Sequence, residues 1–289
     1  MTGDPFIAHR SLLFTVAYEM LGSRADAEDV LQETWLRWAD VERSEVRDPR
    51  AYLVRVVTRQ ALNQLRTVSR RREQYVGEWL PEPLPTGPDV ADDVELAEGV
   101  SIATLTVLET LGPTERIVFV LREVFDVPYG EIGEAIGKPA ATTRQIARRA
   151  REHVAARRPR MEVGKGEHQA VVERLAIALR TGHLQPLVDA LAPDVVLVAD
   201  GGGLAPTALA PVHGREAVAD VLDRASGAPG TVETRIVVLN GMPAVRIELG
   251  GRLGASLSVV VDGGRITWIY LMRNPQKLAL LDEPVQLAR

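Results

Sequence analysis

Charge is the feature of this sequence that most constrains its organisation, because it is concentrated in three blocks. Residues 43–72 hold nine arginines against two acids, and residues 138–160 hold eight bases against Glu152, so each block has a net charge of +7. Between them, residues 76–98 hold seven acids and no base, a net charge of −7. The overall charge of −5 hides this separation. The pattern predicts two basic modules joined by an acidic, proline-rich linker, and two such modules indicate a phosphate-backbone partner.

Composition excludes several classes of protein. The 289 residues are 46% apolar, which is enough for the cores of two or three small domains. The absence of cysteine excludes a disulfide scaffold, a thiol nucleophile and a cysteine-ligated zinc site, and it suits a reducing compartment. With no long apolar run and no secretion signal at its start, we expect a cytoplasmic protein without a membrane partner. The five scattered histidines lack helical metal-site spacing, so we expect no metal and no cofactor.

Two helices are predicted at residues 6–21 and 25–39 from their apolar spacing. The buried stripe expected in the second helix consists of Ala27, Val30, Leu31, Thr34, Trp35 and Trp38. The other side of this helix has an acidic face without a local cation, made of Asp26, Asp29 and Glu33. Such a face would serve an external basic surface.

A third helix is predicted to begin at Asp48-Pro49, because proline is favoured in the first helical turn. Its inward face carries Leu53, Val57, Ala61 and Leu65 at steps of four residues. Another face, together with the loop before the helix, carries basic and amide side chains: Arg47, Arg50, Arg55, Arg59, Asn63 and Arg66. Cations combined with an amide can hold phosphates and read base edges. The alternative is a merely solvated face, which the lack of interleaved acids on the helix disfavours.

Residues 99–162 have the pattern of a helix-turn-helix module. A helix through Arg122 is followed by a short helix that ends at Gly137, and a longer helix then runs from Pro139 to about Arg157. The longer helix would bury Ile146, Ala150 and Val154. The second helix of such a module enters the major groove, and the side chains expected to face DNA are Thr143, Arg144, Arg148 and Arg151.

The remaining residues predict a neutral α+β domain. Helices are expected at 167–181, 183–192 and 215–226, and strands at 194–200, 231–239, 243–249, 253–261 and 265–273. Asp262-Gly263-Gly264 is a hairpin signal between the last two strands. The candidates for acid–base chemistry in this domain are Asp194, Asp200 and His213, although His213 is expected on a surface loop.

Three stretches of sequence resemble a known family. Asp26–Arg37 resembles the core-polymerase-binding helix of bacterial sigma factors, and Leu111–Arg122 followed by Tyr129–Ile132 resembles their promoter −35 module. The chain is thereby similar to extracytoplasmic-function sigma factors of the SigJ-like group, which carry a fused SnoaL-like domain. The hallmarks of that group stand here as Trp79, Leu80, Pro81, Glu82 and Pro83 in the linker, Asp200, Gly201, Gly202 and Gly203 in the tail domain, and Asn274, Pro275, Gln276, Lys277 and Leu278 near the end.

The resemblance implies a multidomain fold of two all-α sigma modules followed by an α+β SnoaL-like cone or barrel. The expected domains are a region 2 helical bundle at 1–75, an acidic proline-rich linker at 76–98, a region 4 helix-turn-helix at 99–162 and a SnoaL-like regulatory domain at 163–289. The last domain would enclose an apolar pocket that could hold an unidentified small molecule.

The resemblance also implies a function. The chain would bind core RNA polymerase, at its β′ clamp and β subunit, and direct it to promoter −10 and −35 elements to initiate transcription. The acidic face would bind polymerase. The basic and amide side chains of the third helix and its loop would bind the −10 element, and the longer helix of the helix-turn-helix would bind the −35 element. The fused domain would modulate this activity by contacts among the three hallmark motifs, with the amides of Gly201–Gly203 binding Glu82. No separate anti-sigma factor is expected.

Two other interpretations stay open. One is a SnoaL-like cyclase or isomerase that carries a DNA-binding appendage. The other is a stand-alone helix-turn-helix repressor. The acidic face at Asp26, Asp29 and Glu33 disfavours the repressor, because a protein that binds only DNA has no use for it.

Overall fold

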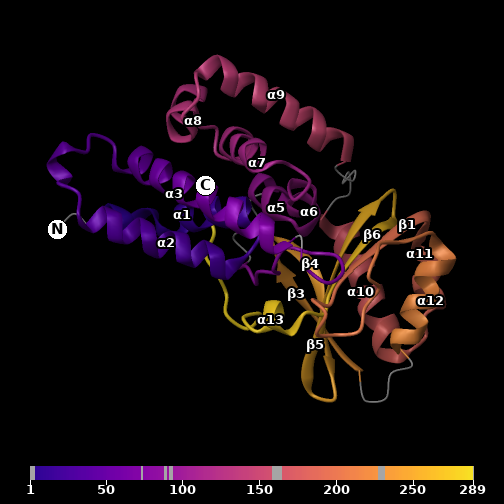
Figure 1. The fold of residues 1–289 in the computed structure, drawn as a ribbon. Helices are drawn as coiled ribbons and strands as arrows, with labels where there is room; N and C mark the ends of the chain where they lie inside the picture. The colour runs from indigo at the N-terminus through magenta and orange to yellow at the C-terminus, as the bar shows by residue number, and fades with distance from the viewer. Residues whose placement is uncertain are drawn as a thin grey trace.

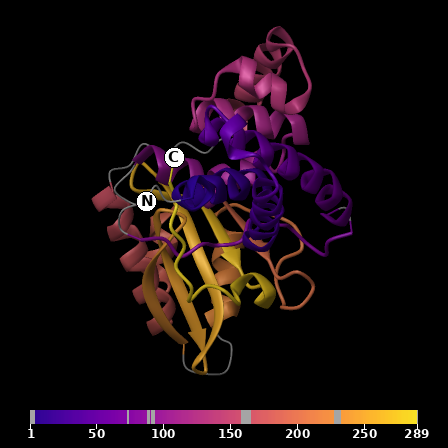
Figure 2. The same cartoon turned by 90° about the vertical axis from the view of Figure 1, so that its left-hand side faces the viewer.

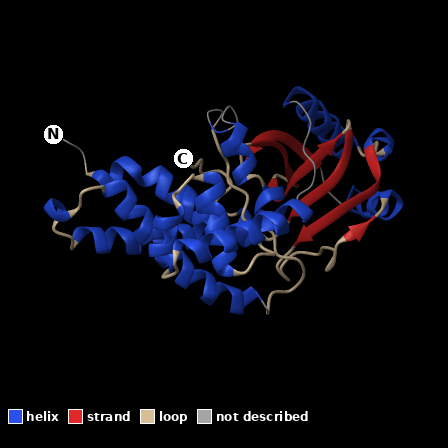
Figure 3. Cartoon of the chain, turned by 90° about the horizontal axis from the view of Figure 1, so that it is seen from above, coloured by secondary structure: helices blue, strands red, loops and turns tan. Residues whose placement is uncertain are grey.

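The computed structural model describes residues 4–72, 74–87, 90, 94–157, 165–226 and 232–288. Within them, an all-helical half is followed by a half in which helices cover a curved sheet (Figures 1 and 3). The predicted fold class is therefore confirmed. The expected boundary between residues 162 and 163, and the linker acids Asp89, Asp92 and Asp93, lie outside the described residues.

The first helical unit consists of α1 (Pro5–Leu21), α2 (Arg24–Ala39), a short 3-10 turn η1 (Arg43–Glu45) and α3 (Pro49–Arg72). Polar side chains begin each long helix, since Asp4, Ser23 and Asp48 accept hydrogen bonds from amides of the first turns. The inward face predicted for α3 is buried throughout. One expectation for α2 is wrong: Trp35 is 37% exposed, because it packs on Phe6 at the edge of the bundle and not in its centre.

The second helical unit contains α5 (Val94–Val100), α6 (Ile102–Leu108), α7 (Pro113–Phe119), a π-helical turn η2 (Val120–Val124), α8 (Tyr129–Ile136) and α9 (Ala140–Arg157). Helices α8 and α9 form the predicted helix-turn-helix. Gly137 ends α8 with a φ of 69°, in the left-handed region. A side chain at Gly133 would collide with the carbonyl of Lys138, so glycine permits the close approach at this turn.

The two helical units share one hydrophobic core, in which side chains of α1 and α3 pack with side chains of α7 to α9. Arg116 on α7 is almost fully buried at this interface, and its guanidinium donates to the backbone carbonyl of Glu19 on α1 at 3.1 and 3.2 Å. It also pairs with Glu109 at 2.6 Å. The units are therefore packed as one body in this structure.

The C-terminal half is a six-stranded sheet with the order β2-β1-β6-β5-β4-β3. Its strands are β1 (Leu191–Asp200), β2 (Val212–His213), β3 (Val232–Leu239), β4 (Met242–Leu249), β5 (Arg252–Asp262) and β6 (Arg265–Met272). All neighbouring pairs are antiparallel except β1 and β6. The helix predicted at 183–192 is shorter than expected, because residues 191 and 192 already belong to β1.

The two faces of the sheet pack against different parts of the chain. Helices α10 (Lys165–Thr181), α11 (Gln185–Ala190) and α12 (Arg215–Ser226) lie on one side (Figure 1). On the other side, Leu80 of the linker and residues of α6 pack against side chains of β1, β5 and β6. After α13 (Pro275–Leu278), the chain returns to the helical half, where Leu287 is buried in the core (Figure 2).

Glu19 predicts a pH-dependent stability. It is fully buried, neither carboxylate oxygen has a hydrogen-bond partner among the described residues, and burial raises the pKa of its carboxyl to about 8. The unfolded chain ionises this group at its ordinary pKa, so the folded state loses stability as pH rises from about 5 to 8. We expect Glu19→Gln to unfold at about the same temperature as the parent at pH 5 and at a higher temperature at pH 8. The corresponding gain in the free energy of unfolding at pH 8 is on the order of a few kcal/mol. Thermal unfolding followed by circular dichroism measures this, and equal pH slopes for the two proteins would contradict it.

Candidate functional site

Asp200, at the end of β1, is the centre of a contact between the linker and the C-terminal domain. Its side chain is fully buried, and its oxygens accept hydrogen bonds from the Tyr75 hydroxyl at 2.6 Å, the Leu80 amide at 2.9 Å and the Lys277 ammonium at 2.7 Å. Lys277 also donates to the Leu80 carbonyl at 2.6 Å. We call this set, with Asn274, the linker anchor. It brings together the three hallmark motifs that are far apart in sequence.

Aromatic rings complete the linker anchor. The Lys277 nitrogen lies 3.4 Å from the ring centroid of Trp79 and 5.0 Å from that of Tyr75, within the range of cation–π attraction. The amide of Asn274 donates to the Tyr75 hydroxyl at 2.7 Å. Burial and the neighbouring Asp200 raise the pKa of Tyr75, which keeps its hydroxyl a donor to that carboxylate. Sequence reasoning missed Tyr75, and its only signal was an aromatic residue close before Trp79.

The loop of Gly201–Gly203, which we call the glycine loop, lies against this contact. Gly202 has a φ of 60°, and a side chain there would collide with the amide of Asn274 and lie 2.9 Å from the Tyr75 hydroxyl. Glycine at this position is thus required for the close approach of the loop. Gly203, with a φ of 71°, also lies close to the linker, because a side chain there would lie 3.2 Å from the Cβ of Val76.

Glu82 does not bind the glycine loop, so that prediction is wrong. Its carboxylate accepts hydrogen bonds from the Arg24 amide at 2.6 Å and the Ser23 hydroxyl at 3.0 Å, at the start of α2. Its backbone carbonyl accepts from the Tyr18 hydroxyl at 2.6 Å. The start of a helix attracts a carboxylate through its free amides and its dipole. The linker is therefore held at Leu80 by the C-terminal domain and at Glu82 by the first helical unit.

Asn240 is a second residue that sequence reasoning missed. It lies in the turn between β3 and β4 with a φ of 53°, and its side chain accepts from the Leu84 amide and donates to Tyr18 and to the carbonyl of Val100. One buried amide thus joins the sheet, the linker and both helical units.

The acidic face on α2 is only partly free. Asp26 is half-buried and accepts a hydrogen bond from the side chain of Gln64 at 2.7 Å. Asp29 and Glu33 are exposed, and neither has a hydrogen-bond or ion-pair partner within the described residues. These two carboxylates are therefore available to a basic surface outside the chain.

The basic face of α3 is partly covered by α8. Arg55 pairs with Glu134 at 3.2 Å, and Arg59 donates to backbone carbonyls of Glu134 and Ala135. The other expected side chains of this face and its loop are exposed: Arg47, Arg50, Asn63 and Arg66. A cavity of about 580 Å³ between the loop and α8 has both Arg47 and the acids of α8 in its wall. Helix α8 thus supplies one acidic partner, Glu134, to the basic face of α3.

The exposed side of α9 carries Arg144, Arg148 and Arg151. Arg148 and Arg151 make ion pairs at 3.4 and 3.6 Å on the surface, which are weak enough to yield to phosphates. Thr143 is fully buried and donates to the carbonyl of Pro139, so the expectation that it faces DNA is wrong. It lies on the inward side of the helix, three residues before Ile146.

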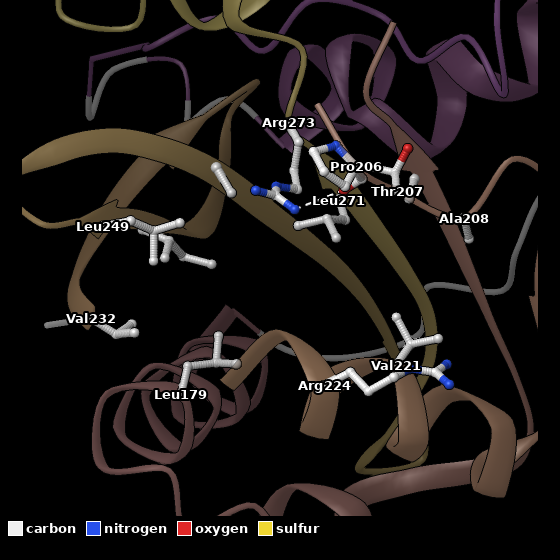
Figure 4. Close-up of a pocket in the computed structure, with 13 residues that line it drawn as sticks. Leu179, Pro206, Thr207, Ala208, Val221, Arg224, Val232, Leu249, Leu271 and Arg273 are labelled. Atoms are coloured by element: carbon white, nitrogen blue, oxygen red, sulfur yellow. Dashed lines mark hydrogen bonds between the residues drawn. The ribbon is translucent and has the colours of Figure 1, made fainter. Parts of the chain in front are cut away.

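A separate cavity of about 500 Å³ lies inside the C-terminal domain, between the sheet, α10 and α12 (Figure 4). None of the three candidate acid–base residues is among its described lining residues. Asp194 and His213 are exposed at the surface, and Asp200 is occupied in the linker anchor. Among the described residues, no group of acidic or histidine side chains could hold a metal ion. In the same part of the chain, no helix is both long and apolar enough to cross a bilayer.

Comparison with known proteins gives the family. Residues 6–71 match the model of Sigma-70 region 2, and residues 101–154 match that of Sigma-70, region 4. The chain is 44% identical over 223 residues to the ECF RNA polymerase sigma factor SigJ of Mycobacterium tuberculosis, covering 75% of this chain and 71% of that protein. It is 33% identical over 274 residues to a probable ECF RNA polymerase sigma factor, SigI, of the same organism, covering 94% and 92%.

A solved structure has the same overall arrangement. The crystal structure of the M. tuberculosis extracytoplasmic function sigma factor SigJ superimposes with a TM-score of 0.75 at 34% identity, covering 95% of this chain and 97% of that chain. The likeness therefore includes the C-terminal α+β half as well as the sigma modules. On these grounds the chain belongs to the extracytoplasmic-function (ECF) family of RNA polymerase sigma factors.

Proposed function

We propose that this sigma factor binds core RNA polymerase through Asp29 and Glu33 of α2 and promoter DNA through the basic faces of α3 and α9. Region 2 would extend over residues 1–75, region 4 over 99–162 and the regulatory domain over 163–289. The exposure of the unpaired acids on α2 supports the first contact. The exposed arginines of α9 support the second, because guanidinium groups bind both phosphates and guanine edges.

The contact between α3 and α8 supports a closed, inactive state. Glu134 occupies Arg55 and approaches Arg59, so DNA phosphates would have to displace an acidic helix from the −10-binding face. Separation of the two helical units would release this face. The single observation that carries the regulatory proposal is the linker anchor, because it fixes the chain segment that joins the two units.

We also propose that the chain acts in transcription initiation and not as an enzyme, in the cytoplasm and without a separate anti-sigma factor. The matched relatives are sigma factors. The cavity that a cyclase or isomerase would use has no carboxylate or imidazole among its described lining residues. General acid–base chemistry needs such a group within hydrogen-bond reach of the substrate.

Removal of the free acids of α2 tests polymerase binding. We expect the double change Asp29→Ala and Glu33→Ala to weaken binding of core RNA polymerase about tenfold, with an unchanged helical circular-dichroism signal. The matched control is Asp40→Ala with Glu42→Ala, which removes the same charge beyond the end of α2. Equal binding of core enzyme by the two double variants would count decisively against the assignment.

Arginine substitutions on α9 test DNA binding. We expect Arg144→Ala or Arg148→Ala to cost about 1–3 kcal/mol if the side chain reads a base, with relaxed specificity at one −35 position. A phosphate contact would instead weaken binding to every sequence and lower the salt slope. Arg149→Ala is the control, since this arginine lies on another face of the same helix. Promoter binding measured by fluorescence anisotropy at several salt concentrations separates these effects, and no change in either variant would reject the docking of α9.

Substitutions in the linker anchor test regulation. Lys277→Met leaves Asp200 buried without its cation, and Trp79→Ala removes the ring beside that cation. We expect each to raise run-off transcription with core enzyme by up to about tenfold, corresponding to about 1.4 kcal/mol. Transcription by the double variant should not exceed that of either single variant, because both changes release the same contact. Arg252→Met, at an exposed arginine of β5, should have no effect. Strictly additive effects would mean that Trp79 and Lys277 act independently.

A further inference from the structure

The cavity of the C-terminal domain has the properties of a small-molecule site. Its volume of about 500 Å³ is within the range of about 300–1,000 Å³ typical of such sites. Ten of its thirteen described lining residues are apolar, and they come from α10, α12, the sheet and the loop after β1. An occupant would therefore bury an apolar body there.

The polar side chains of the lining are the Thr207 hydroxyl, which can donate and accept, and the guanidinium groups of Arg224 and Arg273, which only donate. No acidic side chain is among the described lining residues. Arg273 is half-buried and donates to the carbonyl of Pro206 at 2.7 Å, and Arg224 has no hydrogen-bond or ion-pair partner in the described part of the chain. Figure 4 shows Arg273, Pro206 and Thr207 on one side of the cavity and Arg224 on the other.

We propose that this cavity binds a small organic carboxylate with an apolar body, whose carboxylate bonds to Arg273. A guanidinium with no acidic neighbour in an apolar cavity attracts an anion and repels an amine. Its planar fork matches the two oxygens of a carboxylate. Inorganic phosphate fits less well, because the apolar walls would leave its remaining oxygens without hydrogen bonds. Linear carboxylic acids of the size of decanoate combine an apolar chain with one carboxylate, as the cavity requires.

Arg273 connects the cavity to the linker anchor. Its backbone amide donates to the Asp200 carbonyl at 2.7 Å, and the next residue, Asn274, belongs to the anchor. The carboxylate would compete with the Pro206 carbonyl for the guanidinium and so change the loop that follows Asp200. This consequence rests on the proposed regulatory role of the linker anchor, whereas binding to the cavity does not.

Calorimetric titration of the full-length protein tests the site. Sodium decanoate below its micelle concentration is the probe, and decanol and decylamine are matched probes without the negative charge. We expect decanoate to bind at least about tenfold more tightly than decanol or decylamine. We expect Arg273→Gln to weaken the binding of decanoate by about tenfold to a hundredfold. Arg235→Gln is the control, because Arg235 is exposed on β3 and does not line the cavity.

A second variant keeps the proposal testable if Arg273→Gln fails to fold. Ala208→Phe, on the loop at the cavity wall, fills the space without changing charge and should abolish decanoate binding. No binding of decanoate at millimolar concentration, equal affinity for decanoate and decylamine, or unchanged affinity in Ala208→Phe would each overturn the proposal.

Hydrogen exchange of the Leu80 amide tests the connection to the anchor, because this amide donates to Asp200. We expect decanoate to change its exchange rate several-fold in the parent protein and not in Arg273→Gln. Binding with an unchanged Leu80 rate would overturn the connection. The transcription assay of the anchor variants is independent of both measurements, so failure of the regulatory proposal is recognised separately.

Discussion

The buried pair of Asp200 and Lys277 is the interaction on which the arrangement of the chain depends. Taking two charges out of water is costly, and the cost is offset only when every remaining donor and acceptor finds a partner. Here Asp200 accepts from three groups, and Lys277 donates to two oxygens beside the Trp79 ring. A buried pair with all its hydrogen bonds made tolerates few other arrangements of the surrounding groups. It therefore fixes the position of the linker on the C-terminal domain more than it adds to the free energy of unfolding. It places Leu80 on the face of the sheet that α6 also covers.

The interface between the helical units combines stabilising and destabilising groups. The shared apolar core stabilises the closed arrangement, at about 25 cal/mol for each Å² of apolar surface buried. Two buried polar groups act against it to different degrees. The Glu19 carboxyl has no hydrogen-bond partner among the described residues, whereas Arg116, whose pKa burial lowers to about 9, keeps its bonds to the Glu19 carbonyl and to Glu109. Both groups would be hydrated on separation, which makes opening less costly than apolar area alone suggests. An interface of this kind is compatible with the proposed separation of the two helical units.

Local sequence patterns predicted the elements well because their causes are local. The four-residue steps of α3 and the Asp262-Gly263-Gly264 hairpin depend on near neighbours, and both are present. Contacts between distant segments were not predictable in the same way. Arg55 and Glu134 are 79 residues apart, and nothing in either segment indicates the other. Asn240 shows a further difficulty, since Asn-Gly is a common hairpin turn and this local role conceals its bonds to Tyr18 and Val100.

The same distinction explains the errors within the candidate site. Thr143 precedes Arg144 in the sequence, but one residue of helix turns a side chain by about 100°, and Thr143 is buried while Arg144 is exposed. The sequence predicts the amides of Gly201–Gly203 as the partner of Glu82, but its carboxylate binds the Arg24 amide and the Ser23 hydroxyl at the start of α2. In both cases the residue type indicates a polar contact. Which surface the side chain contacts is decided by the packing of the helices and the linker.

The C-terminal segment and the linker anchor hold the arrangement of the chain in different ways. The outer contacts of the segment are partly exposed: Arg24 with Glu283, and the amides of Val285 and Ala288 with Pro85 and Thr15. Partly exposed ion pairs contribute little and are screened by salt. The linker anchor is buried, so its loss requires water to reach Asp200. Leu281 and Leu287 of the C-terminal segment are buried, so its detachment would also expose apolar surface, whereas release of the linker requires a change at the anchor itself.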